Sequence, residues 1–409
     1  MNSFALRRYE FSITAAAALL AGCGGSQPPV GVPAGVGAHR VETASSSSFR
    51  VLHRFGTSPN DGLRPDASLI DVNGTLYGTT VHGGAYNNEG TVFSISAAGV
   101  ERVLHSFGSS HDGTQPYASL IDVNGTLYGT TASGGAAGKG TVFSVTTAGV
   151  EHVLHSFGSG SDGETPLASL INVNGMLYGT TDWGSTSDGT VFRVSTGGSE
   201  RVLCDFAGGY SGGEPRAALI AVKGTLYGTT ALGGLYGDSY GGDGTLFSVN
   251  ATHGLVILHD FGKGDDGIAP VASLIDVKGT LYGTTLTGPV NFRGNGTVFS
   301  ISADGTERVL HSFGSDDGSR PEAGLIDVKG TLYGTTAFGG AYGYGTVFSI
   351  STDGAEHVLH SFGRLRDGAD GRQPAAGVIY VDGTLYGTTY AGGDHRRSDT
   401  GGTAFALRI

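Results

Sequence analysis

Short apolar runs separated by glycine-rich turns fill most of the chain. One copy of this pattern consists of Ala118 to Val123, Thr126 to Thr131, Thr141 to Thr146 and Val153 to Phe157. Asn124-Gly125, between the first two runs, is the strongest short signal of a β-hairpin. The runs are apolar on both faces, as expected for a sheet packed between two others. The pattern therefore predicts four short antiparallel strands in each copy.

Three segments recur seven times each along the chain. The segment G-x-L-Y-G-T-T begins at Gly74, Gly125, Gly175, Gly224, Gly279, Gly330 and Gly383. The segments G-T-[VLA]-F and V-L-H-x-F-G, the latter with some variation, follow it at similar spacing. Four strands in a unit of about 50 residues, repeated four to eight times, are typical of a β-propeller.

The first and last units indicate that the ring closes. Val51 to Phe55 is a fourth strand that precedes the first complete unit, and the last unit ends after its third strand, Thr403 to Leu407. We expect an all-β, seven-bladed propeller over residues 49–409, in which the N-terminal strand completes the last blade and no blade edge stays open. The alternative is an open solenoid of the same repeats. Gly129 and its equivalents lie inside a strand, which suggests close approach of a neighbouring blade.

The repeat motifs carry a resemblance to a known family. G-T-L-Y-G-T-T-x-x-G-G at 125–135 and 330–340, followed by G-T-V-F and V-L-H-S-F, resembles the tandem GloVer repeat of exported bacterial proteins and, more distantly, the kelch repeat. The resemblance covers about residues 51–409 and implies a surface location, but it brings no catalytic residues with it. Two copies depart from the pattern, with Cys204-Asp205-Phe206-Ala207 in place of H-S-F-G and Gly288-Pro289 in place of Gly-Gly.

Composition narrows the classes of protein further. The chain has 74 glycines in 409 residues, which argues against a helical protein because glycine is weak in helix interiors. A formal net charge of −12 argues against nucleic acid as a partner.

The N-terminus reads as an export signal. Arg7 and Arg8 precede an apolar run from Phe11 to Leu20, which ends in Leu-Ala-Gly-Cys at Cys23. This ending resembles the bacterial lipoprotein signal, which implies a signal peptide at 1–22, a lipid anchor on Cys23 and, because Gly24 follows, the outer membrane or cell surface. Residues 23–48 read as a flexible tether. A plain secretory signal, or twin-arginine export through Arg7 and Arg8, stays open.

The loops between second and third strands vary between units, and binding specificity usually lies in variable loops on a rigid scaffold. We expect these loops to share one face with those joining fourth to first strands, and to bind a glycan or a protein through aromatic and basic side chains. The candidate binding residues are Tyr86, Trp183, Tyr236, Tyr240, Phe292, Arg293, Tyr342, Tyr344, His395, Arg396 and Arg397. The alternative is sequence drift in loops without a function.

Two rings of equivalent polar residues have structural interpretations. An Asp of D-G-x-x-P recurs in the fourth-to-first loop, where Asp-Gly forms a turn and Pro fixes the next strand; a cation-attracting ring of carboxylates is the alternative. A His recurs on the fourth strand, and equivalent positions in adjacent blades are too far apart to share a zinc ion. We therefore predict packed histidines with a hydrogen-bonded ring nitrogen, no metal site, no cofactor, and an inert, partly buried thiol at Cys204.

Taken together, these features favour a monomeric, lipid-anchored propeller that acts as a non-catalytic binding or scaffold module. The alternative is a hydrolase or lyase whose site lies where the central channel opens on the variable face. Asp66, Arg216 and Glu322 are the charged residues among the seven first-strand entry positions, and they are the candidate catalytic residues of that alternative. A purely structural coat component is a third possibility.

Overall fold

The repeats fold into strands where their apolar pattern places them. The computed structural model describes residues 48–109, 111–184, 187–236, 242–250, 254–288, 295–302, 305–365, 368–393 and 401–409. Ser46–Ile409 group into one compact unit. The predicted signal peptide, Cys23 and nearly all of the tether lie outside the described residues.

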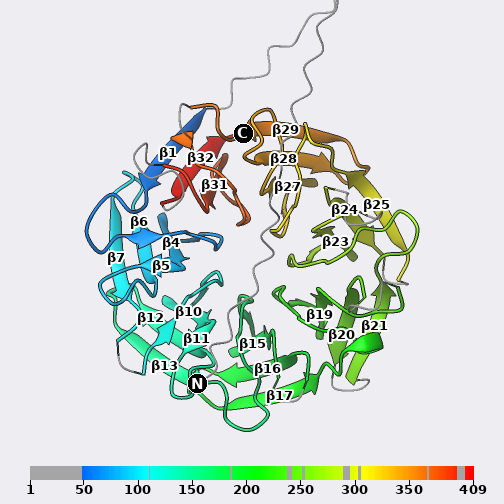
Figure 1. Ribbon diagram of the computed structural model, residues 1–409, viewed down its shortest axis with the longest axis horizontal. Helices are drawn as coiled ribbons and strands as arrows, with labels where there is room; N and C mark the ends of the chain where they lie inside the picture. The colour runs from blue at the N-terminus through cyan, green and yellow to red at the C-terminus, as the bar shows by residue number, and fades with distance from the viewer. Residues whose placement is uncertain are drawn as a thin grey trace, which may run out of the picture. The chain divides into compact units, whose positions relative to one another are not determined.

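Seven four-stranded antiparallel sheets, called blades 1 to 7, follow one another around a ring (Figure 1). Blade 1 contains β3 (Ile70–Val72), β4 (Thr75–Thr80), β6 (Thr91–Ile95) and β7 (Glu101–Ser106); blade 2 contains β9 (Ile121–Val123), β10 (Thr126–Thr131), β12 (Thr141–Thr146) and β13 (Glu151–Ser156). Blade 3 contains β14 (Ile171–Val173), β15 (Met176–Thr181), β16 (Thr190–Ser195) and β17 (Glu200–Asp205); blade 4 contains β18 (Ile220–Val222), β19 (Thr225–Thr230), β20 (Thr245–Asn250) and β21 (Gly254–Asp260). Blade 5 contains β22 (Ile275–Val277), β23 (Thr280–Thr285), β24 (Thr297–Ile301) and β25 (Glu307–Ser312); blade 6 contains β26 (Ile326–Val328), β27 (Thr331–Thr336), β28 (Thr346–Ser351) and β29 (Glu356–Ser361).

Blade 7 confirms the predicted closure of the ring. It contains β30 (Ile379–Val381), β31 (Thr384–Thr389), β32 (Thr403–Arg408) and the N-terminal strand β1 (Phe49–Arg54). β1 pairs antiparallel with β32, with Phe49 opposite Leu407 and Arg54 opposite Thr403. The Thr388 hydroxyl donates a hydrogen bond of 3.1 Å to the Ala67 carbonyl, which links blade 7 directly to blade 1. The solenoid alternative is therefore wrong.

The hydrophobic core is divided into seven layers, one between each pair of adjacent blades. Between blades 1 and 2, for example, Phe107 and Val92 pack against Leu120 and Phe143. Buried phenylalanines from neighbouring blades make edge-to-face contacts in these layers, such as Phe107 with Phe143 at 5.0 Å between ring centroids. The blades are held to one another by these layers, so a side chain on one blade has a fixed position relative to the next.

Two local details follow from the repeat sequence. Asn124 (φ 55°) and Gly125 (φ 83°) both have positive φ, as the predicted two-residue hairpin requires. Gly129 in β10 is needed for a different reason from the one predicted. A Cβ there would lie 2.7 Å from Cζ of Phe143 and 3.0 Å from Leu120, both in the same blade. The expected close approach of a neighbouring blade is thus wrong, since the blade's own phenylalanine fills the space.

Candidate functional site on the loop face

The fourth-to-first loops and the second-to-third loops pair with each other in every blade, which places them on one face of the ring. In two blades the pairing forms small sheets, β2 (Gly62–Leu63) with β5 (His82–Gly83) and β8 (Gly113–Thr114) with β11 (Ser133–Gly134). In the other five it is a single bridge, and these are Glu164 with Trp183, Gly213 with Leu232, Ile268 with Thr287, Ser319 with Phe338 and Arg372 with Ala391. We call this side of the ring the loop face.

Four of the predicted binding residues are exposed on the loop face. The exposed fractions are 49% for Tyr86, 45% for Trp183, 48% for Tyr342 and 38% for Tyr344. Tyr236 is partly buried, with the ammonium of Lys263 5.9 Å from its ring centroid. The remaining candidates lie outside the described residues, and these are Tyr240, Phe292, Arg293, His395, Arg396 and Arg397.

Trp183 borders a groove between blades 3 and 4. The groove has a volume of about 230 Å³, and the carboxylates of Asp188 and Glu214 line it together with Leu232 and glycines of both loops. The fourth-to-first loop here carries the 3-10 helix η1 (Gly209–Ser211) and has Ser211 where the equivalent loops have Asp. The groove thus coincides with the place where the repeat pattern is broken.

Arg216 connects this groove to the central channel. Its guanidinium lies 3.0 Å from the Asp182 carboxylate and 2.7 Å from that of Glu214. Burial raises the pKa of Asp182 and of Glu214, and the charge of Arg216 opposes both shifts. A half-exposed guanidinium held between two carboxylates gives a polar cluster beside the indole of Trp183.

The three charged entry residues, Asp66, Arg216 and Glu322, line one cavity of about 160 Å³ at the central channel. Burial raises the pKa of Asp66 to about 7; the charge of Glu322 adds to the shift and that of Arg64 opposes it. Burial also raises the pKa of Glu322, although Arg320 binds its carboxylate at 3.0 Å. Asp66 and Glu322 therefore form an interacting acid pair, while Arg216 is engaged by Asp182 and Glu214.

Serines complete the channel wall. The Ser119 hydroxyl accepts a hydrogen bond of 2.9 Å from the backbone N–H of Ser68, and Ser169 accepts one from Ser119 in the same way. These bonds run from blade to blade, so the small polar residues here fix the ring as well as lining the channel.

The histidines of the fourth strands are mostly paired, as predicted. Nε2 of His105, His155, His259 and His311 lies 2.9–3.2 Å from the Asp of the following loop. Nε2 of His53 and of His360 faces the equivalent Asp from farther away, at 3.4 and 3.6 Å, and is buried without a hydrogen-bond partner. The Asp residues also accept backbone N–H groups in their turns, as Asp162 does from Gly158 and Ser159.

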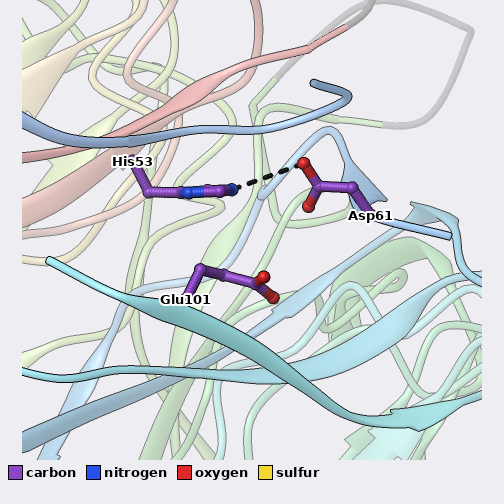
Figure 2. A group of neighbouring side chains, drawn as sticks. All are labelled: His53, Asp61 and Glu101. Atoms are coloured by element: carbon purple, nitrogen blue, oxygen red, sulfur yellow. Dashed lines mark ion pairs between the residues drawn. The ribbon is translucent and has the colours of Figure 1, made fainter. Parts of the chain in front are cut away.

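Sequence reasoning considered the His and the Asp separately and missed a third residue. Glu101 of β7 faces His53 and Asp61, as Figure 2 shows, and the same arrangement recurs for His105, Asp112 and Glu151 and for His311, Asp317 and Glu356. The sequence signal for this residue was the Glu four positions before the His in E-R-V-L-H. Its side chain faces the His of the preceding blade and not the His of its own strand.

Cys204 matches its predicted character. It is a free thiol, partly buried beside Val191 and Leu255, and burial raises its pKa to about 11. A thiol with so high a pKa is a poor nucleophile at neutral pH.

The fold defines the class of protein as a seven-bladed β-propeller with one elaborated loop face. The model of the Gloeobacter/Verrucomicrobia repeat matches residues 39–192 and 182–405. The chain therefore belongs to this repeat family, as its motifs indicated.

Solved structures similar to this chain have low sequence identity to it. They include a Bacteroides uniformis protein provisionally assigned as a 6-phosphogluconolactonase, with 14% identity, 76% of this chain and 88% of that chain covered, and a TM-score of 0.48. A Xanthomonas campestris gluconolactonase has 14% identity, 87% and 99% coverage and a TM-score of 0.43. A luciferin-regenerating enzyme has 14% identity, 70% and 88% coverage and a TM-score of 0.40. No match was found among the curated proteins. Within the described ranges, no helix has the length and apolar character of a membrane span.

Proposed function

We propose that this propeller is a carbohydrate-binding module whose ligand occupies the groove at Trp183 on the loop face. The observation that carries the proposal is the half-exposed indole beside a groove lined by the carboxylates of Asp188 and Glu214. An indole stacks on the apolar face of a sugar ring, and carboxylates accept hydrogen bonds from its hydroxyl groups.

The asymmetry of the ring supports this choice of site. Seven equivalent loops give seven equivalent surfaces, whereas one ligand-binding site needs a surface that differs from its copies. The groove lies where Ser211 replaces the recurring Asp and where the loop forms a helical turn. Arg216 adds a cation at the end of the groove that faces the channel.

Screening the full-length chain on a glycan array, followed by calorimetric titration of the retained glycans, tests the proposal. We expect Trp183→Ala to weaken binding at least about 10-fold, since aromatic contacts at the centre of a binding site are worth more than about 1.4 kcal/mol. Tyr86→Ala is the matched control, because Tyr86 is equally exposed on the loop face but lies in blade 1. If no glycan is retained and both variants instead weaken capture of a protein from an envelope extract, the ligand is a protein.

We further propose that the module is held at the bacterial cell envelope by a lipid on Cys23, with residues 23–48 as tether. The motif Leu-Ala-Gly-Cys supports this placement. Metabolic labelling with palmitate tests it: Cys23→Ser should lose both the label and the membrane association, whereas Cys204→Ser should keep both. A soluble, unlabelled parent protein would contradict the lipid anchor.

The acid pair in the channel supports a second candidate, a hydrolase. Two interacting buried carboxyls, one of them with its pKa raised to about 7, are the arrangement from which a general acid and its partner base are built. A panel of chromogenic glycosides and lactones tests this function. We expect any turnover to be lost in both Asp66→Asn and Glu322→Gln and to survive in Trp183→Ala; activity that persists in the two channel variants would exclude the pair as the catalytic site.

A further inference from the structure

Away from the loop-face groove, the outer rim of the ring carries clusters of imidazole and carboxylate groups between neighbouring blades. Each cluster takes a His from the fourth strand of one blade, an Asp from the loop that follows, and a Glu from the fourth strand of the next blade. In three clusters the candidate ligand atoms all lie within 4.8 Å of one another; these are His53, Asp61 and Glu101; His105, Asp112 and Glu151; and His311, Asp317 and Glu356.

The first cluster is electrostatically incomplete. His53 Nε2, Asp61 Oδ1 and Glu101 Oε1 are all buried without a hydrogen-bond partner, and the side chain of Asp61 is 0% exposed. Figure 2 shows the three side chains pointing toward one another. Each buried polar atom without a partner costs about 1–3 kcal/mol, and more when the group is charged. His53 Nε2 faces Asp61 Oδ2 at 3.4 Å without making a hydrogen bond, so a cation held by the three side chains would satisfy all of these atoms.

We propose that His53, Asp61 and Glu101 bind a divalent transition-metal cation of the zinc type. In the two equivalent clusters the His and the Asp are already hydrogen-bonded to each other at 2.9–3.0 Å. Zinc accepts imidazole nitrogen and carboxylate oxygen at about 2.0–2.2 Å, and two ligands of a tetrahedral ion at this distance lie about 3.4 Å apart. His53 Nε2 lies 3.4 Å from Asp61 Oδ2. Three protein ligands leave the fourth position to water.

The interface between blades 3 and 4 supplies independent support, because there the three residues are lost together. Between blades 3 and 4 the equivalent residues are Cys204, Ser211 and Leu255, and Cys204 and Leu255 pack into an apolar cluster. If the Asp served only to form the turn and the His only to pack, loss of these two would not require loss of a Glu in the next blade. The joint replacement indicates that the Glu is present only where the His and the Asp are present as well.

The interface between blades 6 and 7 shows that the Glu is also dispensable when an aromatic ring covers the His. There Phe49 occupies the Glu position and stacks on His360, with 3.9 Å between ring centroids. A stacked ring shields the imidazole without offering a ligand, so we propose no metal site at this interface.

A cation at the first cluster would reinforce the closure of the ring. His53 lies on β1, which completes blade 7, and Glu101 lies on β7 of blade 1. The ion would join the N-terminal strand to the neighbouring blade, in addition to the strand pairing of β1 with β32.

Calorimetric titration with ZnCl₂ tests the proposal on the full-length chain, purified without a polyhistidine tag and stripped of metal with a chelator. We expect saturable binding and a rise in Tm on addition of ZnCl₂. The double variant Asp61→Ser with Glu101→Leu should bind one equivalent fewer, and it should fold, because the chain already contains Ser211 and Leu255 at this type of interface. Glu101→Gln, which preserves size, should weaken the same site at least about 10-fold.

Two controls decide between a metal and its alternatives. CaCl₂ should neither bind with similar affinity nor raise Tm, because Ca²⁺ prefers oxygen ligands to an imidazole nitrogen. Equal effects of CaCl₂ and ZnCl₂ would overturn the assignment. The proposal is also overturned if ZnCl₂ leaves Tm unchanged, or if the double variant binds as many equivalents as the parent. In that case a proton held by the side chains of the cluster takes the place of the metal.

Discussion

Gly129 lies in the middle of β10, opposite Phe143 of β12. The ring of Phe143 occupies the space where any other residue would place its Cβ. A Cβ added to any of the six equivalent glycines would likewise lie 2.6–2.7 Å from Cζ of a phenylalanine. G-x-L-Y-G-T-T and G-T-V-F are therefore two halves of one packing unit. The φ of Gly129 lies outside the left-handed region, so the backbone conformation alone does not require glycine. The requirement comes from the contact with Phe143 within the blade.

Replacing Gly129 with Ala tests this packing. The added methyl group would lie 2.7 Å from Phe143 Cζ, so either the ring or the strand must move. Overpacking of this kind costs about 1–3 kcal/mol. We expect a lower free energy of unfolding by chemical denaturation. Gly197→Ala is the control, because a Cβ at that position has its nearest neighbour at 3.8 Å, and equal stability of the two variants would show that the packing unit is not rigid.

Asp66 predicts how stability depends on pH. Its pKa is about 7 in the folded chain and 3.8 as a free group, so between these values the folded state binds more protons than the unfolded state. Stability contributed by this group is full below about pH 4 and is lost as the pH rises toward 7. Each tenfold change in the proton equilibrium is worth about 1.4 kcal/mol.

We therefore expect Asp66→Asn to lose less stability than the parent between pH 5 and pH 8, as measured by Tm across that range. Glu200 and Glu356, whose pKa values burial raises to about 7, contribute a dependence of the same sign in both proteins. The difference in Tm between parent and variant at each pH therefore reports the contribution of Asp66 alone. Parallel Tm curves would show that Asp66 is ionised throughout.

At the level of elements, the strands and hairpins could be predicted and the partnerships between blades could not. Asn124-Gly125 has a local cause, since both residues adopt positive φ in a two-residue turn. The contact of Glu101 with His53 and Asp61 joins different repeats, and the periodic pattern assigns each residue only to its own unit. Comparison among the seven copies shows the link, because Cys204, Ser211 and Leu255 change together.

The strand β1 is the element on which closure depends. It pairs with β32 along most of its length, and Phe49 packs against Phe405 at 5.7 Å between ring centroids. Deleting residues 48–54 should expose the edge of β32 and the core layer around Phe362. An exposed strand edge pairs readily with another chain, so copies of the protein should associate. We expect a lower Tm and dimers or larger species by size-exclusion chromatography. Deletion of residues 30–47 is the control and should leave a monomer with the Tm of the parent.

At the level of the whole molecule, the repeat count and the missing last strand were sufficient to predict a closed ring of seven blades. They were sufficient because a blade without its fourth strand leaves backbone donors and acceptors unpaired, and β1 satisfies them. The groove at Trp183 could be predicted only as a variable loop. Its shape depends on how loops of blades 3 and 4 pack together, and no periodic signal describes a position where the repeat is broken.

Closure by strand pairing also predicts that the position of the chain ends is interchangeable between blades. Arg408 N–H donates to the Ser48 carbonyl at 3.4 Å, so the end of β32 and the start of β1 are adjacent and a short turn can join them. In blade 2 the third and fourth strands are joined in this way by residues 147–150, and that turn can be opened between Ala148 and Gly149. The resulting permuted chain would begin with the fourth strand of blade 2 and would close that blade as β1 now closes blade 7.

We expect the permuted chain to fold to a monomer whose free energy of unfolding is within about 1–2 kcal/mol of that of the linear chain 48–409, since joining nearby ends and opening an equivalent turn have opposite entropic effects of similar size. Circular dichroism, size-exclusion chromatography and urea denaturation measure this. A permuted chain that unfolds or dimerises, while the linear chain stays monomeric, would mean that blade 7 closes the ring by interactions that blade 2 lacks. The cluster of His53, Asp61 and Glu101 is the first candidate for such an interaction.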